Sequence, residues 1–263
     1  MISNYTTKNW EHQIRHFDLI EKVSKGIFLF LLTFCSTMSI QAQDTFTSVK
    51  SGNYSDPATW GTTELPTAAD DVVVSTGNTI TLDGDFTATN VVIDGKIEAS
   101  SNSYEYTVLG DLVLSSSGLF IANYYKDQGD YGFYKGMKLT VSGSILNDGR
   151  IDLSLGETND GNGVLKLNGT LLQTISGTGR FGGVITATDN SNTRSVINQL
   201  EIDNTSTATP NIVWEFNNIR IKSILTLTNA RVNLFSNKMT IGNYDGATTN
   251  VSTGSGFLSG TIG

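Results

Sequence analysis

Two pairs of carboxylates have a spacing that could serve catalysis. These are Asp127 with Asp130, and Asp152 with Glu157. Hydrolysis of a glycosidic bond needs two carboxyl groups about 5 to 9.5 Å apart, one on each side of the scissile bond. Both pairs lie in or near predicted turns, where solvated carboxylates are ordinary. A polysaccharide-degrading enzyme, a lyase or a glycoside hydrolase, is therefore the alternative hypothesis, and no catalytic residue is assigned.

The first 42 residues have the order of a cleaved secretory signal peptide. Lys22 and Lys25 precede an apolar run at residues 27–34, and a small and polar stretch, CSTMSIQAQD, follows. The apolar run is far shorter than the ~20 residues that a membrane-spanning helix needs. We expect cleavage after Ala42 and a secreted or outer cell-surface location. A membrane anchor is the alternative interpretation of the same run.

Removal of this leader would leave a chain without histidine or cysteine, because His12, His16 and Cys35 all precede residue 43. That excludes disulfides, thiol nucleophiles, a Ser-His-Asp triad and the usual His/Cys zinc sites. The leader carries four of the 17 Lys and Arg residues but only three of the 25 Asp and Glu residues. The remaining chain is acidic and shows no basic run, so we expect no nucleic-acid partner.

A polar loop at residues 157–163, ETNDGNG, is the candidate for a metal site. Asp160 and Asn162 alternate there before a glycine, as they do in calcium-binding loops. The full series of ligands is missing, so an ordinary loop is the favoured interpretation. Ca²⁺ is the one cofactor considered, and otherwise none is expected.

An aromatic insertion at residues 123–136, NYYKDQGDYGFYKG, interrupts the regular pattern of the chain. Aromatic faces with interleaved polar groups suit sugar rings, which offer apolar C–H faces and hydroxyl edges. A loop folded over the flank of the molecule is the favoured interpretation. The functional hypothesis is that the insertion contacts an extracellular glycan or another cell-surface component. The candidate binding residues are Tyr124, Tyr125, Tyr131, Phe133 and Tyr134.

Short apolar pairs alternate with polar residues in residues 224–242, ILTLTNARVNLFSNKMTIG, and similar stretches occupy residues 139–154 and 164–179. Alternation at period two predicts strands with one apolar face. The three apolar pairs are separated by turn-prone residues, at Asn229 and at Ser236 with Asn237, and we expect turns there. A unit that repeats about every 22 residues cannot bury this face alone and must stack on its neighbours. We therefore predict a mainly β fold, and more specifically a right-handed parallel β-helix, or solenoid.

Local features fit the ends and corners of such a coil. Trp60 is expected to cap its first turn, where the core would otherwise be exposed, and stacking against a ligand is the alternative interpretation. Asp94-Gly95 suits a positive φ angle at a tight corner. Trp214 and Phe216 are spaced to share one face of a strand, in the core or on the flank.

Residues 48–122 resemble the opening of G8-type domains. The resemblance is carried by Trp60, Pro66, Asp70-Asp71 before three valines, TITLD at residues 79–83, and NVVIDGKIEA. It implies a glycine-rich β-helical module of an extracellular protein, and some proteins of that family are linked to hyaluronan breakdown. We carry over the fold and not an activity.

Residues 164–242 resemble the repeats of large surface proteins that Bacteroidetes-like bacteria export by the type IX route. The resemblance is carried by NGTLLQTISGTG, NQLEIDNTS and then residues 224–242. It implies secretion machinery as a partner, reached through a C-terminal sorting domain. No such domain is recognisable, and the sequence ends within a repeat, GFLSGTIG, so we expect a fragment whose last strands associate or fray.

Three parts are expected along the chain: a signal peptide and leader at residues 1–42, a G8-like β-helix at 43–185, and continuing, truncated repeats at 186–263. The leading hypothesis is a secreted or cell-surface structural and adhesion protein that binds glycans through its loops. This function needs no catalytic residue, which agrees with a chain that would lack histidine and cysteine after cleavage.

Overall fold

A computed structural model describes residues 43–99, 104–122, 136–153, 163–182 and 195–242, and the backbone of 250–253 and 257–262. The chain divides into two units, Met1–Ala42 and Gln43–Gly263, and all of the described strands belong to the second. The predicted leader lies outside the described residues. Among the described residues, no helix has the length and apolar character to span a bilayer.

The strands follow one another in three series that recur in the same order along the chain. The first series is β1 (Thr45–Thr47), β3 (Asp71–Val74), β6 (Val91–Ile93), β9 (Leu112–Leu114), β12 (Ile145–Asn147), β15 (Gln173–Ser176) and β18 (Ile212–Trp214). The second is β2 (Gly52–Asn53), β4 (Thr79–Leu82), β7 (Lys96–Ala99), β10 (Leu119–Ile121), β13 (Arg150–Asp152) and β16 (Arg180–Phe181). The third is β5 (Phe86–Ala88), β8 (Glu105–Val108), β11 (Lys138–Val141) and β14 (Val164–Leu167). The last strands are β17 (Ser195–Ile202), β19 (Ile219–Leu227), β20 (Arg231–Ile241), β21 (Asn250–Thr253) and β22 (Phe257–Ile262).

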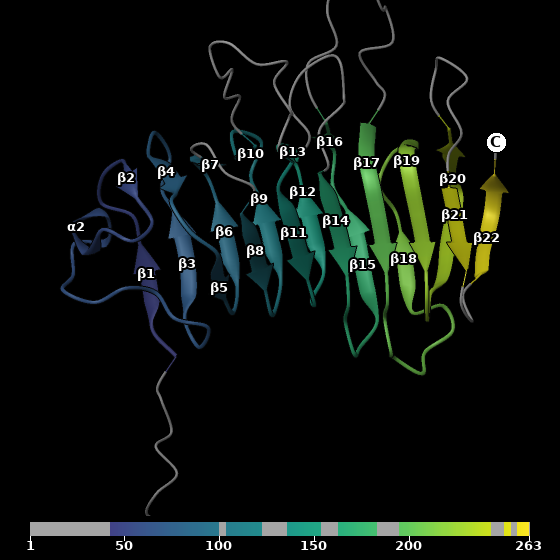
Figure 1. Cartoon of the computed structure of the whole chain (residues 1–263), viewed down its shortest axis with the longest axis horizontal. Helices are drawn as coiled ribbons and strands as arrows, with labels where there is room; N and C mark the ends of the chain where they lie inside the picture. Colours follow the sequence, from purple (N-terminus) through teal and green to yellow (C-terminus); the bar gives the residue numbers. More distant parts are fainter. Residues whose placement is uncertain are drawn as a thin grey trace, which may run out of the picture. The chain divides into compact units, whose positions relative to one another are not determined.

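Strands of one series pair with each other in parallel, so each strand contacts the one that follows a full circuit of the chain later. In the first series Val92 lies opposite both Val73 and Val113. In the second series Ile97 lies opposite both Ile80 and Phe120. Figure 1 shows the strands side by side from β1 to β22. The mainly β, parallel fold predicted from the sequence is confirmed in this form.

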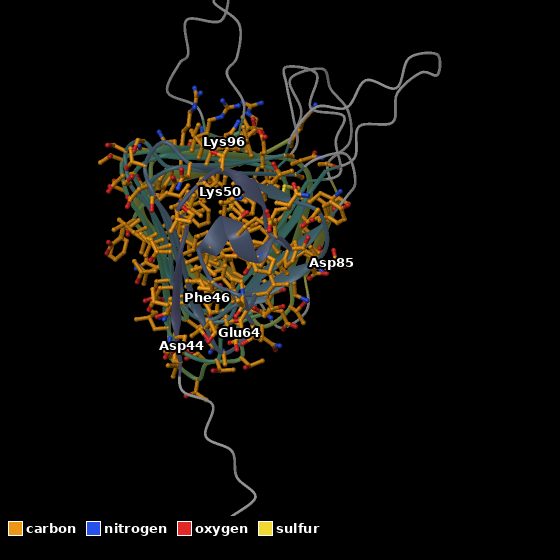
Figure 2. All side chains as sticks on the ribbon, turned by 90° about the vertical axis from the view of Figure 1, so that its left-hand side faces the viewer. Asp44, Phe46, Lys50, Glu64, Asp85 and Lys96 are labelled. Carbon is orange, nitrogen blue, oxygen red and sulfur yellow. The ribbon has the colours of Figure 1, made fainter. Side chains whose placement is uncertain are left out.

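The core lies between the series, because alternate residues of each strand point inward. In β3 and β4 the burial alternates residue by residue. Valine, isoleucine and leucine fill most inward positions, and Trp214 and Phe216 are also fully buried, as their spacing predicted. Figure 2 shows side chains filling the interior at the β1 end, with Phe46 among them.

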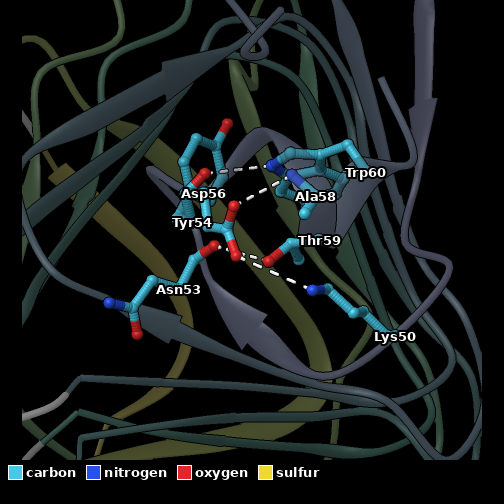
Figure 3. Close-up of polar contacts among 7 residues, drawn as sticks. All are labelled: Lys50, Asn53, Tyr54, Asp56, Ala58, Thr59 and Trp60. Carbon is cyan, nitrogen blue, oxygen red and sulfur yellow. Dashed lines mark hydrogen bonds and ion pairs between the residues drawn. The ribbon is translucent and has the colours of Figure 1, made fainter. Parts of the chain in front are cut away.

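The helix α2 (Pro57–Trp60) covers the β1 end of the core. Asp56 caps it by accepting a hydrogen bond from the backbone N–H of Ala58, and Gly61 ends it in the left-handed region. Trp60 is 3% exposed and packs edge-on against Phe46 and Tyr54. Its indole N–H donates to the Tyr54 carbonyl at 2.9 Å (Figure 3). Trp60 therefore covers the β1 end of the core, where the sequence predicted a cap.

Glycines stack at the corner between the first and second series. A Cβ atom at Gly149 would overlap the carbonyl oxygens of Ser115 and Gly118, and one at Gly179 would overlap that of Gly149. The positive φ expected at Asp94-Gly95 is wrong, because Gly95 lies outside the left-handed region. Close approach of the preceding circuit, rather than backbone conformation, is what requires glycine there.

Residues 224–242 form two strands where the sequence suggested three short pairs. Asn229 separates β19 from β20 as expected. Ser236 and Asn237, expected to make a turn, lie inside β20 instead. The strand bends there through Phe235, which has a φ of 48°, and its pairing with β22 shifts register between Asn233 and Lys238. One left-handed residue thus turns the corner without ending the strand.

Candidate functional site

Most residues that the sequence nominated lie outside the described residues. This holds for the whole aromatic set of Tyr124, Tyr125, Tyr131, Phe133 and Tyr134, for Asp127 and Asp130, and for Glu157, Asp160 and Asn162. The glycan, carboxylate-pair and calcium hypotheses that rest on them stay predictions. Within the described residues, no group of three His, Cys, Asp or Glu side chains is placed to hold a metal ion.

Asp152 is the one member of the carboxylate pairs that the structure describes. It is 2% exposed, and its carboxylate forms an ion pair and a hydrogen bond with the Arg150 guanidinium two residues earlier. The Nε of Arg150 also donates to the Gly182 carbonyl at 3.1 Å. Asp152 therefore holds an arginine in place on β13 rather than facing solvent in a turn.

A groove of about 810 Å³ lies at the corner between the first and second series, toward the C-terminal half of the described fold. It spans four successive circuits of the chain, from the corner before β13 to the start of the second half of β20. Its lining consists of corner residues, strand starts and their polar side chains. These are Gly149, Thr178, Gly179, Arg180, Ser195, Asn217, Asn218, Ile219, Arg220, Asn237, Lys238 and Thr240.

An extra strand layer lies next to this corner. In the first series β15 pairs directly with β18. In the second series, the first half of β17 lies between β16 and β19: Ser195 pairs opposite Ile219, and its Oγ accepts a hydrogen bond from the Phe181 N–H at 3.1 Å. The second series therefore holds one more layer than the first at this point. Ser195 lies between β16 and β19, and it lines the groove together with residues of the corners before those two strands.

Three cationic side chains line the groove. Arg180 begins β16, Arg220 lies in β19, and Lys238 lies in β20. Arg220 is opposite Thr240 in the pairing of β19 with β20, so both belong to the outer face of the sheet. No aspartate or glutamate is among the described lining residues. This is a local excess of positive charge on a chain whose formal net charge is −8.

The surroundings of Arg180 lower the pKa of its guanidinium group. It lies directly opposite Arg150 in the pairing of β13 with β16. Burial lowers the pKa of Arg180, the nearby charge of Arg150 lowers it further, and the carboxylate of Asp152 opposes the change. An arginine remains charged under these conditions, so the groove holds a fixed positive charge.

Amide and hydroxyl groups complete the lining. Asn218 accepts a hydrogen bond from the Lys238 N–H at 2.7 Å, and Asn237 donates to the Trp214 carbonyl at 3.3 Å. These two bonds hold the corners together. Asn217 is exposed, and Thr240 is half-buried on the outer face of β20. Such a lining offers donors and acceptors to a ligand with many hydroxyl groups, and cations to one that carries negative charge.

Sequence reasoning missed this groove for a physical reason. Its cations are far apart in the chain, and no basic run marks them. The extra layer depends on the pairing of residues 195–197, which local alternation does not reveal. A usable signal was the recurrence of asparagine before two aligned strands, Asn218 before IRI and Asn237 before KMTI.

Comparisons of the chain with protein-family models, with curated proteins and with solved structures found no match of any kind.

Proposed function

We propose that this chain forms a right-handed parallel β-helix of a secreted or outer cell-surface protein, and that it acts as a structural and adhesion module that binds glycans. The parallel pairing of each strand with one a full circuit later supports the β-helix. The signal-peptide order of the first 42 residues supports export. The resemblances to G8-type domains and to type IX-exported repeats agree with both, and secretion machinery is the expected export partner.

The groove at the extra strand layer carries the glycan part of the proposal. Its volume of about 810 Å³ lies within the ~300–1,000 Å³ of known small-ligand sites. Its lining is rich in amides and hydroxyls, which match the alternating donors and acceptors of sugar hydroxyls. A scaffold of stacked strands holds these groups on rigid elements, so little conformational freedom is lost on binding.

The aromatic insertion is a second contact proposed for the same ligand class. In the sequence it lies between β10, a strand of the second series, and β11, a strand of the third series. The connection from β13 to β14 leaves at the corresponding corner one circuit later, since Ile121 pairs opposite Asp152. The strands that precede these two connections are thus neighbours in the second series, and we propose that the connections contribute to one adhesive surface.

The alternative prediction, a polysaccharide-degrading enzyme, gains no support from the described residues. Asp152 is neutralised by Arg150, and the other three nominated carboxylates lie outside the described residues. We therefore do not propose a catalytic role.

Binding of the purified protein to a panel of immobilised polysaccharides tests the proposal. We expect retention on at least one of them. The double variant Asn217→Ala/Thr240→Ala should weaken it about tenfold, because each lost hydrogen bond is worth roughly 0.5–1.5 kcal/mol. Thr226→Ala, on the outer face of β19 away from the groove, is the matched control and should bind normally. A parent protein that binds no polysaccharide would overturn the proposal.

The aromatic insertion is tested in the same assay with Tyr131→Ala/Tyr134→Ala. Weaker retention on any polysaccharide that the parent binds would support the contact. Unchanged binding to all of them would remove the insertion from the proposal and leave the groove.

A further inference from the structure

We infer that the outer face of the first series binds a basic amphipathic helix of a partner protein. The contact is an apolar stripe with aspartates on both sides of it. The stripe consists of the outward side chains of Val73, Val92, Val113 and Leu146. This inference goes beyond the proposed glycan binding and uses none of the residues that line the groove, so neither depends on the other.

Strand pairing makes the apolar stripe continuous over four successive circuits. Val92 lies opposite Val73 and Val113, and Val113 lies opposite Leu146. Their neighbours in β3, β6, β9 and β12 are buried, so the four side chains of the stripe face outward. With about 4.8 Å between strands, the stripe is roughly 15 Å long.

The stripe is apolar on the solvent side of a sheet, where the third series carries a column of threonine. Leu146 is 40% exposed, and the three valines are half-buried. In the third series Thr107 lies opposite Thr87 and Thr140. Threonine suits a strand as valine does, so strand formation alone does not require an apolar side chain here. An apolar patch with a polar rim is typical of an interaction surface.

Aspartates border the apolar stripe on alternate sides. Asp71 and Asp111 lie two residues before the valines of β3 and β9. Asp94 and Asp148 lie two residues after Val92 and Leu146, directly beyond the ends of β6 and β12. Two residues of extended strand span about 7 Å, so the two borders are roughly 14 Å apart.

This face has no positive charge of its own. The strands β3, β6, β9, β12 and β15, with the residues directly before and after each, contain no lysine or arginine. Among the described residues, no ion pair involves Asp71, Asp94, Asp111 or Asp148. Asp111 is held in place by the N–H of Ser144, which donates to its carboxylate at 2.7 Å. The face therefore complements a partner that brings cations on both sides of an apolar line.

An amphipathic helix matches both spacings of this face. One helical turn rises about 5.4 Å, close to the ~4.8 Å between strands, so a helix along the stripe places about one apolar residue on each circuit. Its diameter with side chains is about 10–12 Å, which fits between the two borders. Lysine and arginine on its flanks reach the aspartates while their aliphatic stems cover the stripe. An acidic helix would meet like charges, so the face selects a basic one.

Fluorescence anisotropy of a labelled peptide tests the inference. The probe is a synthetic helix of about 14 residues, with leucine on one face and lysine on the rest, and its matched control carries glutamate in place of lysine. We expect the purified protein to bind the lysine peptide, more weakly as salt is raised, and not to bind the glutamate peptide. No binding of the lysine peptide, or equal binding of both peptides, would overturn the inference.

Substitutions in the stripe test the apolar part of the contact. Val92→Thr/Val113→Thr should weaken binding of the lysine peptide roughly tenfold, because two apolar contacts are lost and two hydroxyls become buried. Val164→Thr, at a half-buried outward position of β14, makes the same exchange in the third series and should have no effect. Unchanged binding by the double variant would overturn the inference.

Substitutions at the borders test the charged part. Asp94→Asn/Asp111→Asn should weaken binding about two- to fivefold, as expected of exposed charges, and an amide oxygen can still accept from the Ser144 N–H. Asp85→Asn/Glu201→Gln removes two charges away from the stripe and should have no effect. Equal losses in both double variants would indicate attraction by net charge and would contradict the stripe.

Two further measurements keep the result decisive. Urea unfolding shows which variants retain the fold, and the border variant, with nearly isosteric surface changes, decides the inference if the valine variant unfolds. Analytical ultracentrifugation of the parent tests a second copy of the chain as the occupant. A dimer that Val92→Thr/Val113→Thr abolishes would assign the stripe to self-association and overturn the inference.

Discussion

Asp70 joins the start of the first strand to the turn that precedes β3. Its carboxylate accepts hydrogen bonds from the N–H and the hydroxyl of Thr67, at 2.8 and 2.7 Å, and from the N–H of Asp44 at 3.1 Å. Burial raises its pKa, but the hydrogen bonds from Thr67 and Asp44 outweigh this, so the pKa is lowered from 3.8. One carboxylate of the Asp70-Asp71 pair thus has a structural role.

Asp70→Asn should make the stability of the protein less sensitive to acid. Because the folded pKa is below the unfolded one, the ionised group stabilises the fold fully above about pH 4, and this contribution is lost as the pH falls through the folded pKa. Urea unfolding at pH 7, 4 and 2.5 should show a smaller drop for the variant than for the parent. Glu64→Gln, at an exposed position, controls for net charge. Parallel pH curves for the parent and Asp70→Asn would contradict this role.

At the scale of elements, the corner before the second series depends on close contact between circuits. Gly149 packs onto the carbonyl oxygens of Ser115 and Gly118, and Gly179 packs onto Gly149 in turn. The column of glycines lets the strands on either side of the corner keep their parallel register.

Gly149→Ala should lower the free energy of unfolding by roughly 1–3 kcal/mol, since the added methyl group has no room without a shift of backbone. Gly84→Ala is the matched control, because its Cβ would only contact the Phe86 ring at 3.6 Å. Chemical denaturation of both variants checks this. Equal effects would show that the corner relaxes easily.

A network of buried polar side chains links the corner between the third and first series. The side chain of Gln173 accepts from the Gly169 N–H at 2.9 Å and donates to the carbonyls of Val141 and Gly143. Asn204 donates to Gln173 at 2.8 Å, and Asn211 donates to the Asn204 carbonyl. Gln173, Asn204 and Asn211 are all fully buried. These bonds satisfy backbone groups at the corner, including the Gly169 N–H and the Gly143 carbonyl.

Gln173→Ala should therefore cost about 2–3 kcal/mol, because several buried partners lose their hydrogen bonds at once. Gln199→Ala, at a half-buried position in β17, is the control and should cost less than about 0.5 kcal/mol. Thermal or urea unfolding distinguishes the two. A small loss at Gln173 would mean that water replaces the side chain.

The strands were predictable from sequence because their signal is local. Alternating apolar pairs such as Leu225 and Leu227 mark an inward face directly, and both are buried. Two of the stretches that carry the resemblance to exported repeats, NGTLLQTISGTG and IDNTS, are in contact in the structure. Asn204 of the second stretch donates a hydrogen bond to the side chain of Gln173 in the first. The candidate groove was not predictable, because its cations meet only through long-range pairing. The sequence suggested a turn at Ser236 and Asn237, whereas the strand continues through them after one left-handed residue, Phe235, because such a residue can redirect a strand without ending it.

At the scale of the whole fold, each strand is stabilised by the neighbouring strands with which it pairs. Each strand pairs with its neighbours in the same series, so an end is stable only if something covers it. At the β1 end α2 and Trp60 provide this cover, with Phe46 and Tyr54 packed beneath the indole.

Trp60→Ala should loosen the β1 end first. The lost aromatic packing is worth roughly 3–5 kcal/mol, and strands near the cap feel it before distant ones. Amide hydrogen exchange should accelerate strongly in β1 to β4 and little in β14 and β15. Trp60→Phe keeps most of the packing and should show a milder version of the same gradient. Uniform acceleration along the chain would mean that the fold unfolds as one cooperative unit.

The extra layer contributed by residues 195–197 is, in the language of crystals, a dislocation: an additional half-plane that ends inside an otherwise regular lattice. The first series has no counterpart of this layer, and the groove lies at the corner where the first and second series meet. A perfectly periodic coil would offer the same shallow surface at every circuit and could not single out one place. One irregularity in the strand pairing therefore distinguishes this site from the regular surface on either side of it. Deleting that half-plane while keeping the flanking strands would restore the period and close the groove.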